Sequence, residues 1–129
     1  MMNNKDDPLA FENVIPDASG RFRLVRISFP YDLDHSVYER FTEVFEIIGW
    51  KYIDWIMVPV IIGYDAEDDP WSIAKTGALL NTQTGELSLV TNPQRRFESM
   101  DKYLDVVTQS WSAHYKIVPS AGISPHPRP

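Results

Sequence analysis

The sequence predicts an α+β domain in which a mainly antiparallel sheet carries two amphipathic helices packed on one face. Two observations lead to this prediction. Apolar residues alternate with polar ones in some segments and recur at helical spacing in others, but strands and helices do not alternate regularly along the chain. The 129 residues, of which 43% are hydrophobic and 23% are charged, are enough for one domain with a core of its own.

The chain divides into three predicted parts. Residues 1–19 are acidic and hold two prolines with little periodicity, which predicts a flexible N-terminal arm that its few apolar residues could anchor in part. Residues 20–119 form the predicted single α+β domain. Residues 120–129 contain three prolines and one glycine, which predicts a disordered tail.

The first strand and the first helix follow the arm. Arg21–Ile27 alternates basic and apolar residues over most of its length, which is typical of a strand with one buried face. A helix is predicted over Val37–Ile48, because Ser36 and Glu39 fit a capping box and Gly49 could supply a left-handed C-cap. The apolar stripe of this helix consists of Val37, Phe41, Val44, Phe45 and Ile48.

The middle of the chain predicts strands. Trp50–Tyr64 is rich in β-branched and aromatic residues, which indicates a strand buried on both faces, with Pro59 at an edge, a bulge or a break. An acidic loop follows over Asp65–Pro70. Trp71–Leu80 and Leu87–Val90 are predicted as two strands joined by a glycine-containing turn.

A second helix and a short strand complete the predicted domain. Ser99 is a suitable N-cap, and Asp101 is favourable in the first turn of a helix. The buried stripe of this helix consists of Met100, Leu104, Val107 and Trp111. The last predicted element is a strand over His114–Val118.

The charge of the chain is negative and unevenly distributed. Lys and Arg number 12 against 18 Asp and Glu, so the formal net charge is −6. Between Asp32 and Asp69 there are ten acidic residues and two basic ones. This balance disfavours nucleic acid backbones and anionic membranes, and it favours a basic protein partner whose approach it would accelerate. The same charges could also serve solubility alone.

The sequence lacks the motifs of common catalytic and cofactor sites. It has no cysteine, which excludes disulfides and thiolate chemistry, and it has no zinc-protease, phosphate-loop or nucleophile-elbow motif. Its three histidines are far apart in the sequence, so we expect no metal, no cofactor and no catalysis. Asp65, Glu67 and Asp69 alternate as calcium ligands do, but Pro70 and Trp71 follow instead of the glycine and closing glutamate that such loops use.

The sequence shows no signal for membrane insertion or export. The longest apolar run, Ile56–Ile62, is too short to cross a membrane and is interrupted by Pro59. Residues 1–8 are polar and acidic, unlike a positively charged apolar leader. Together with the lack of cysteines, this predicts a cytoplasmic protein.

The second half of the chain resembles the SUKH (SMI1/KNR4-like) superfamily over about residues 55–111. The resemblance is carried by the hairpin Leu79-Leu80-Asn81-Thr82-Gln83-Thr84-Gly85-Glu86-Leu87 and by the helix start Phe97-Glu98-Ser99-Met100-Asp101-Lys102-Tyr103-Leu104. Asn81 stands where the family usually has Asp. The resemblance implies an antiparallel sheet packed against helices. Because many bacterial members are immunity proteins, it also implies binding and neutralisation of a toxin such as a nuclease or deaminase, with no catalytic residues carried over.

The first functional hypothesis is therefore an acidic protein of the immunity type that binds a basic toxin stoichiometrically. Its predicted contact residues in and beside the acidic loop are Asp65, Glu67, Asp68, Asp69 and Trp71. A second predicted patch, on the first helix, consists of Glu39, Glu43 and Glu46. Charges at the rim of such an interface mainly set the association rate and its salt dependence, whereas an aromatic anchor adds affinity.

Two other classes of function stay open. One is a homo-oligomeric adaptor or assembly subunit, phage- or secretion-related, and a stable oligomer that buries Trp71 would favour it. The other is a small-ligand binder or enzyme, which would need a deep pocket lined by Tyr52, Trp55 and Tyr64. An inhibitor that mimics nucleic acid phosphates is a variant of the first hypothesis.

Overall fold

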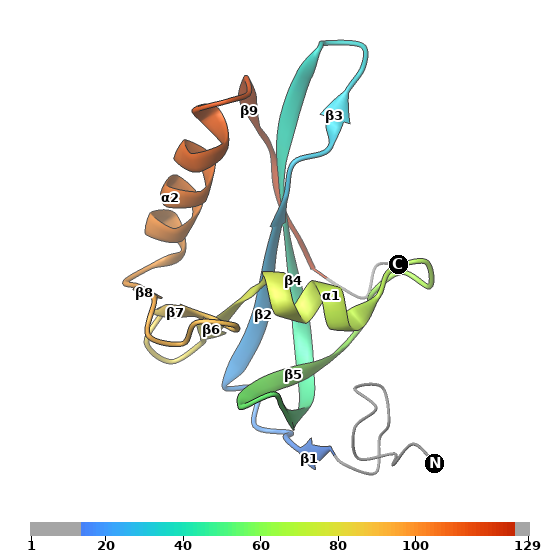
Figure 1. Ribbon diagram of the computed structural model, residues 1–129, viewed down its shortest axis with the longest axis vertical. Helices are drawn as coiled ribbons and strands as arrows, with labels where there is room; N and C mark the ends of the chain where they lie inside the picture. The colour runs from blue at the N-terminus through green and yellow to red at the C-terminus, as the bar shows by residue number, and fades with distance from the viewer. Residues whose placement is uncertain (1–13, 126–129) are drawn as a thin grey trace.

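The computed structural model describes residues 14–125 and confirms the α+β class (Figure 1). Within these residues, one nine-stranded sheet and two helices make up the fold. All strand pairs are antiparallel except the one formed by the last strand. The strands are β1 (Ile15–Pro16), β2 (Phe22–Ser28), β3 (Tyr31–Asp32), β4 (Val37–Ile53), β5 (Ile56–Ile62), β6 (Ala78–Asn81), β7 (Leu87–Leu89), β8 (Arg96–Phe97) and β9 (Ile117–Pro125), and the helices are α1 (Pro70–Thr76) and α2 (Met100–Ser112).

The long strand β4 is the centre of the sheet. Its residue Glu46 pairs with Arg23 of β2 and with Ile62 of β5, so β2 and β5 lie along opposite edges of β4. By the same reasoning, β1 and β3 share the edge that pairs with β2, and β9 shares the edge that pairs with β5. Beyond β2 the sheet continues through β6, β7 and β8.

The predicted helix over Val37–Ile48 is wrong, because this segment is the first part of strand β4. Ser36 is not an N-cap. It has a positive φ of 53° in the turn that joins β3 to β4. Gly49 is not a C-cap either. It lies inside β4, where a Cβ atom would meet the Val14 side chain and come within 2.9 Å of the carbonyl oxygen of Ile15. The glycine thus lets β1 lie close against β4.

Two of the strands predicted in the middle of the chain are also corrected. Trp50–Tyr64 is not a single strand, because a two-residue turn separates the end of β4 from β5. Trp71–Leu80 is not a single strand, because its first part is helix α1 and only its end belongs to β6. Asp69 caps α1 and Pro70 occupies its first turn, a position that suits the fixed φ of proline.

The remaining elements follow the predictions more closely. Strand β2 matches the predicted strand Arg21–Ile27, and the hairpin of β6 and β7 encloses the predicted turn. The Ser99 hydroxyl accepts a hydrogen bond of 3.2 Å from the backbone N–H of Lys102 and so caps α2 as expected. Strand β9 includes residues 120–125, which the sequence assigns to the tail. Residues 1–13 of the predicted arm and 126–129 of the predicted tail lie outside the described residues.

The two helices pack against opposite faces of the sheet. Neighbouring residues of a strand point to opposite faces, and Leu24 and Val25 of β2 belong to different apolar clusters. Leu24 shares its cluster with Ile73 of α1, whereas Val25 shares its cluster with Tyr103 of α2. The expectation that both helices pack on one face is corrected accordingly. The first cluster consists of Leu24, Phe45, Ile47, Val58, Ile61, Ile73, Ala74 and Val90.

The segment that contains β1 is held against β4 by a polar contact. The indole N–H of Trp50 donates a hydrogen bond of 2.7 Å to Asp17 Oδ2, and the backbone N–H of Asp17 donates one of 2.9 Å to the Ile48 carbonyl. The backbone N–H of Ser19 donates to the other carboxylate oxygen of Asp17 at 2.8 Å. Residues 14–19 of the predicted arm are therefore docked on the sheet.

The contact between Asp17 and Trp50 is expected to weaken in acid. Hydrogen bonds from Ser19, and then from Trp50, lower the pKa of Asp17 from its ordinary value of 3.8 to about 2. A carboxylate whose pKa is depressed by folding stabilises the fold above its unfolded pKa and loses this effect as the pH falls through its folded pKa. An NMR titration should show the Trp50 indole N–H resonance moving with a midpoint near pH 2. The movement should be absent in Asp17→Asn, and a midpoint near pH 3.8 would contradict the contact.

Candidate functional site

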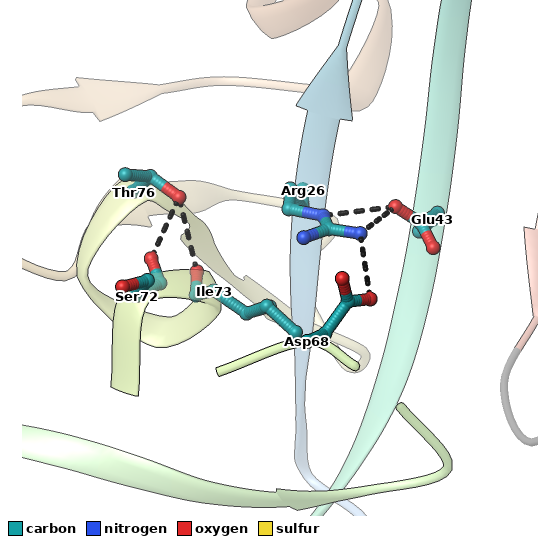
Figure 2. A network of polar contacts seen from close by, with 6 residues as sticks. All are labelled: Arg26, Glu43, Asp68, Ser72, Ile73 and Thr76. Carbon is teal, nitrogen blue, oxygen red and sulfur yellow. Dashed lines mark hydrogen bonds and ion pairs between the residues drawn. The ribbon is translucent and has the colours of Figure 1, made fainter. Parts of the chain in front are cut away.

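The acidic loop is tied to the sheet by an ion-pair network (Figure 2). Arg26 of β2 and Glu43 of β4 are directly opposite in the strand register. Arg26 Nε donates a hydrogen bond of 2.8 Å to Glu43 Oε1, and its Nη2 also contacts this oxygen. The same Nη2 lies 3.7 Å from Asp68 Oδ2, so one guanidinium joins two strands to the loop. Glu43 is only 3% exposed, which gives this network a structural role.

The other end of the loop is fixed by the start of α1. Asp69 Oδ1 accepts a hydrogen bond of 3.0 Å from the backbone N–H of Trp71, and Oδ2 accepts one of 3.0 Å from the Ser72 hydroxyl. Trp71 is half-buried against the first apolar cluster, and Lys75 Nζ lies 5.3 Å from the centre of its ring. Asp69 and Trp71, both predicted contact residues, therefore also have structural roles in the fold.

Three predicted contact residues of the loop are exposed: Asp65, Glu67 and Asp69. The Asp69 carboxylate accepts the two hydrogen bonds at the start of α1, and Asp68 is partly covered. The backbone N–H of Asp68 donates a hydrogen bond of 2.9 Å to the carbonyl of Asp65, which closes a turn around Glu67. The loop thus presents two carboxylates from a backbone that is held at Asp68 and Asp69.

The second predicted patch does not exist in the form expected, because its residues lie on a strand. Glu39 and Glu46 are exposed, but Glu43 is buried in its contact with Arg26. Side chains of a strand alternate between its two faces, so Glu46 points to the face opposite to that of Glu43. Glu39, Glu43 and Glu46 therefore do not form one surface.

The structure shows an exposed aromatic site that the sequence reasoning did not identify as a contact surface. Trp55 is 87% exposed and Tyr52 is 59% exposed, and both lie at the tip of the hairpin of β4 and β5. Their ring centres are 6.2 Å apart and their planes are at 88°. Met57 is directly opposite Tyr52 in the register and is also exposed. The available signal of this surface was a tryptophan inside a two-residue turn. The turn itself was not recognised, because the sequence predicts one continuous strand over Trp50–Tyr64.

The pocket expected for a small-ligand binder is not formed by the predicted residues. Tyr52, Trp55 and Tyr64 are all exposed. Tyr64 comes after the end of β5, whereas Tyr52 and Trp55 come before its start. A small cavity of about 140 Å³ lies behind the hairpin, but none of the three lines it. Its lining includes Asp54 of the turn, apolar residues of β4 and β5, Trp71 and Lys75. The ligand-binding alternative therefore loses the site proposed for it.

Residues 14–125 contain neither a metal-binding cluster nor a membrane-spanning helix. In that part of the chain, no three histidine or carboxylate side chains are grouped so that they could hold a metal ion. Neither helix is long and apolar enough to cross a membrane. The side chains of the acidic loop and of the hairpin tip are thus the features from which function is inferred.

Comparison with known proteins adds no relative. No protein-family model, no curated protein and no solved structure matches this chain.

Proposed function

We propose that this protein is a non-catalytic binding module that holds and neutralises a basic protein, in the manner of a bacterial immunity protein that binds a toxin such as a nuclease. One observation supports this most directly. Asp65 and Glu67 are exposed on a loop whose neighbouring residues Asp68 and Asp69 are fixed by Arg26 and by the start of α1. A loop that is already ordered loses little conformational entropy when it binds, so its carboxylates are suited to a defined partner.

The overall charge supports the same kind of partner. The formal net charge is −6, and the acidic residues concentrate between Asp32 and Asp69. A field of this sign accelerates the encounter with a basic protein and repels nucleic acid. A partner whose own function is to bind nucleic acid carries the complementary charge.

The resemblance to the SUKH superfamily supports the immunity type within this class. It covers about residues 55–111, and the hairpin of β6 and β7 and the capped helix α2 lie in this region. A cytoplasmic location is part of the proposal and agrees with a sequence that has no cysteine. The protein would act stoichiometrically, as one copy on one toxin.

Charge reversal in the loop is the test of this proposal. The double variant Asp65→Lys/Glu67→Lys is expected to lower the association rate constant for the partner about tenfold or more at low salt, with a smaller change in dissociation. The partner is first captured from the native host and purified. Surface plasmon resonance then measures both rate constants at low and at moderate salt, and inhibition of the partner's own activity is measured alongside.

A matched control separates the loop from the net charge. Glu98→Lys/Asp105→Lys changes the net charge by the same amount at two exposed positions around α2, remote from the loop in the sequence. This control should retain most of the association rate. Equal losses in the two double variants, or no loss in either, would reject the loop as the contact surface.

A further inference from the structure

The hairpin tip of β4 and β5 combines two exposed aromatic rings with a carboxylate. Trp55 and Tyr52 stand at 88° to each other with ring centres 6.2 Å apart, and Asp54 precedes Trp55 in the turn. Trp55 is the most exposed of the large hydrophobic residues described, at 87%. The tip is separated from the acidic loop by the length of β5, because the turn precedes this strand and the loop follows it (Figure 1).

The backbone of the turn is unfavourable for the residues it carries. Asp54 has a φ of 50° and Trp55 a φ of 67°, so both lie in the left-handed region. Two-residue hairpin turns of this kind prefer Asn or Asp at the first position and Gly at the second. Asp54 fits this preference, but Trp55 stands where glycine would be less strained. Trp55 is almost fully exposed, so packing within this fold does not explain why this strained position carries a tryptophan.

The opposite face of the hairpin explains how the tip is held. Ile53 and Ile56 are paired across the turn and pack against the first apolar cluster, and Val58 belongs to that cluster. Tyr52 and Met57 form the next pair and lie on the other face, where both are exposed. The hairpin is therefore anchored by one face and presents the aromatic side chains on the other.

Two exposed perpendicular aromatic rings, with an aspartate next to the tryptophan in the sequence, are suited to a cation. The face of an indole or phenol ring attracts an ammonium or guanidinium group, and a neighbouring carboxylate adds a charge-assisted hydrogen bond. An exposed tryptophan and tyrosine are also the residue types that contribute most to protein interfaces. With a net charge of −6, this protein attracts a surface that carries such cations.

We propose that the hairpin tip, formed by Tyr52, Asp54, Trp55 and Met57, is a docking site for an arginine or lysine side chain on the basic partner. This inference rests on the proposed function and adds a second contact, at the far end of β5 from the acidic loop. The cation would lie on the indole of Trp55 against the ring of Tyr52, and the charge of the neighbouring Asp54 would add to its attraction. The stem of the side chain would contact Met57.

The test uses a hexa-arginine peptide as a defined probe, with a hexaglutamate peptide for comparison. Two-dimensional NMR of the whole chain follows the Trp55 indole N–H and the backbone amides of the hairpin and of the loop. Hexa-arginine should shift the Trp55 and Tyr52 resonances, whereas hexaglutamate should not. Asp54→Asn and Trp55→Gly should each weaken the hairpin response about threefold or more, as expected when one cation–π or ionic contact is lost.

The Trp55→Gly variant distinguishes binding from folding. Because glycine relieves the left-handed strain, the thermal unfolding midpoint should be equal to or above that of the wild type although the peptide response is lost. Leu33→Gly is the matched control, since Leu33 is also an exposed apolar residue within a hairpin turn, the one that joins β3 to β4. It should leave the response at the Trp55 hairpin unchanged. If Trp55→Gly does not fold, Asp54→Asn decides the question.

The result separates this inference from the proposed function. Shifts at the hairpin alone support the docking site and reject the acidic loop as a contact. Shifts at Asp65 and Glu67 alone reject the docking site and leave the proposed function standing. Shifts at neither reject both. A Trp55 indole resonance that moves with protein concentration in the absence of peptide would identify a second copy of this chain as the occupant and overturn the inference.

Discussion

Replacing Phe45 by alanine is expected to lower the free energy of unfolding by about 4 kcal/mol, the largest effect that we predict for a single residue. Phe45 is fully buried in the middle of β4 and belongs to the cluster covered by α1. Its removal leaves a cavity between the sheet and the helix, because the flanking strands cannot close around it without breaking their pairing. Urea denaturation followed by circular dichroism measures the change.

Ile48→Ala is the matched control on the same strand. Ile48 is exposed beside the irregularity in the pairing of β4 with β5, so its truncation should change the free energy of unfolding by about 0.5 kcal/mol or less. Similar losses in the two variants would show that Phe45 does not occupy the core of this domain.

The second large effect is expected for Arg26. Its replacement by methionine should destabilise the domain by about 3 kcal/mol, because the buried carboxylate of Glu43 loses the guanidinium that neutralises it. The volume of the side chain is roughly retained in this variant, so the loss reports charge and hydrogen bonding more than packing. The measurement is again the free energy of unfolding from urea denaturation.

A double-mutant cycle identifies the cause of this loss. Arg26→Met/Glu43→Leu removes both charges and should recover most of the stability, since apolar residues can replace a buried ion pair at little cost. Asp68→Asn should cost about 1 kcal/mol or less, because this carboxylate is partly exposed and 3.7 Å from the guanidinium. If the double variant is no more stable than Arg26→Met, the charge of Glu43 is not the cause.

The sequence predicted the fold class and the elements whose signals are local. Ser99 was recognised as the cap of α2 because its hydroxyl accepts a hydrogen bond from the backbone N–H of Lys102, only three residues later in the sequence. The hairpin around Gly85 was recognised because its turn residues are contiguous. Such features do not depend on what the rest of the chain does, and the structure reproduces them.

Strand β4 could not be predicted in this way, because its identity depends on distant partners. Both faces of the sheet are covered, so apolar residues occur on both sides of β4 and their combined spacing imitates a helical stripe. Phe45 contributes to the cluster under α1, whereas Val44 packs against the cluster under α2. The density of β-branched and aromatic residues was the better indicator, and pairing with β2 and β5 decided the outcome.

The candidate site was predictable in its charge but not in its geometry. Asp65 and Glu67 are exposed as the sequence suggested. The structural roles of Glu43 and Asp68 require Arg26, whose place in an alternating strand does not indicate which carboxylates it will contact. The aromatic tip was missed for a related reason: a turn of Asp and Trp lacks the glycine by which such turns are normally recognised.

The central position of β4 has a consequence for how the chain acquires its structure. Among residues 14–125, β4 pairs with five other strands, and β9 is the last of these to be synthesised. A sheet dominated by pairings between distant segments folds slowly, because loops must close before their contacts form. While the chain is still on the ribosome, the first half of β4 already has β2 beside it but not β9. The first half of one edge of the strand, Tyr38–Val44, is therefore open to pairing with other chains until translation has passed residue 125.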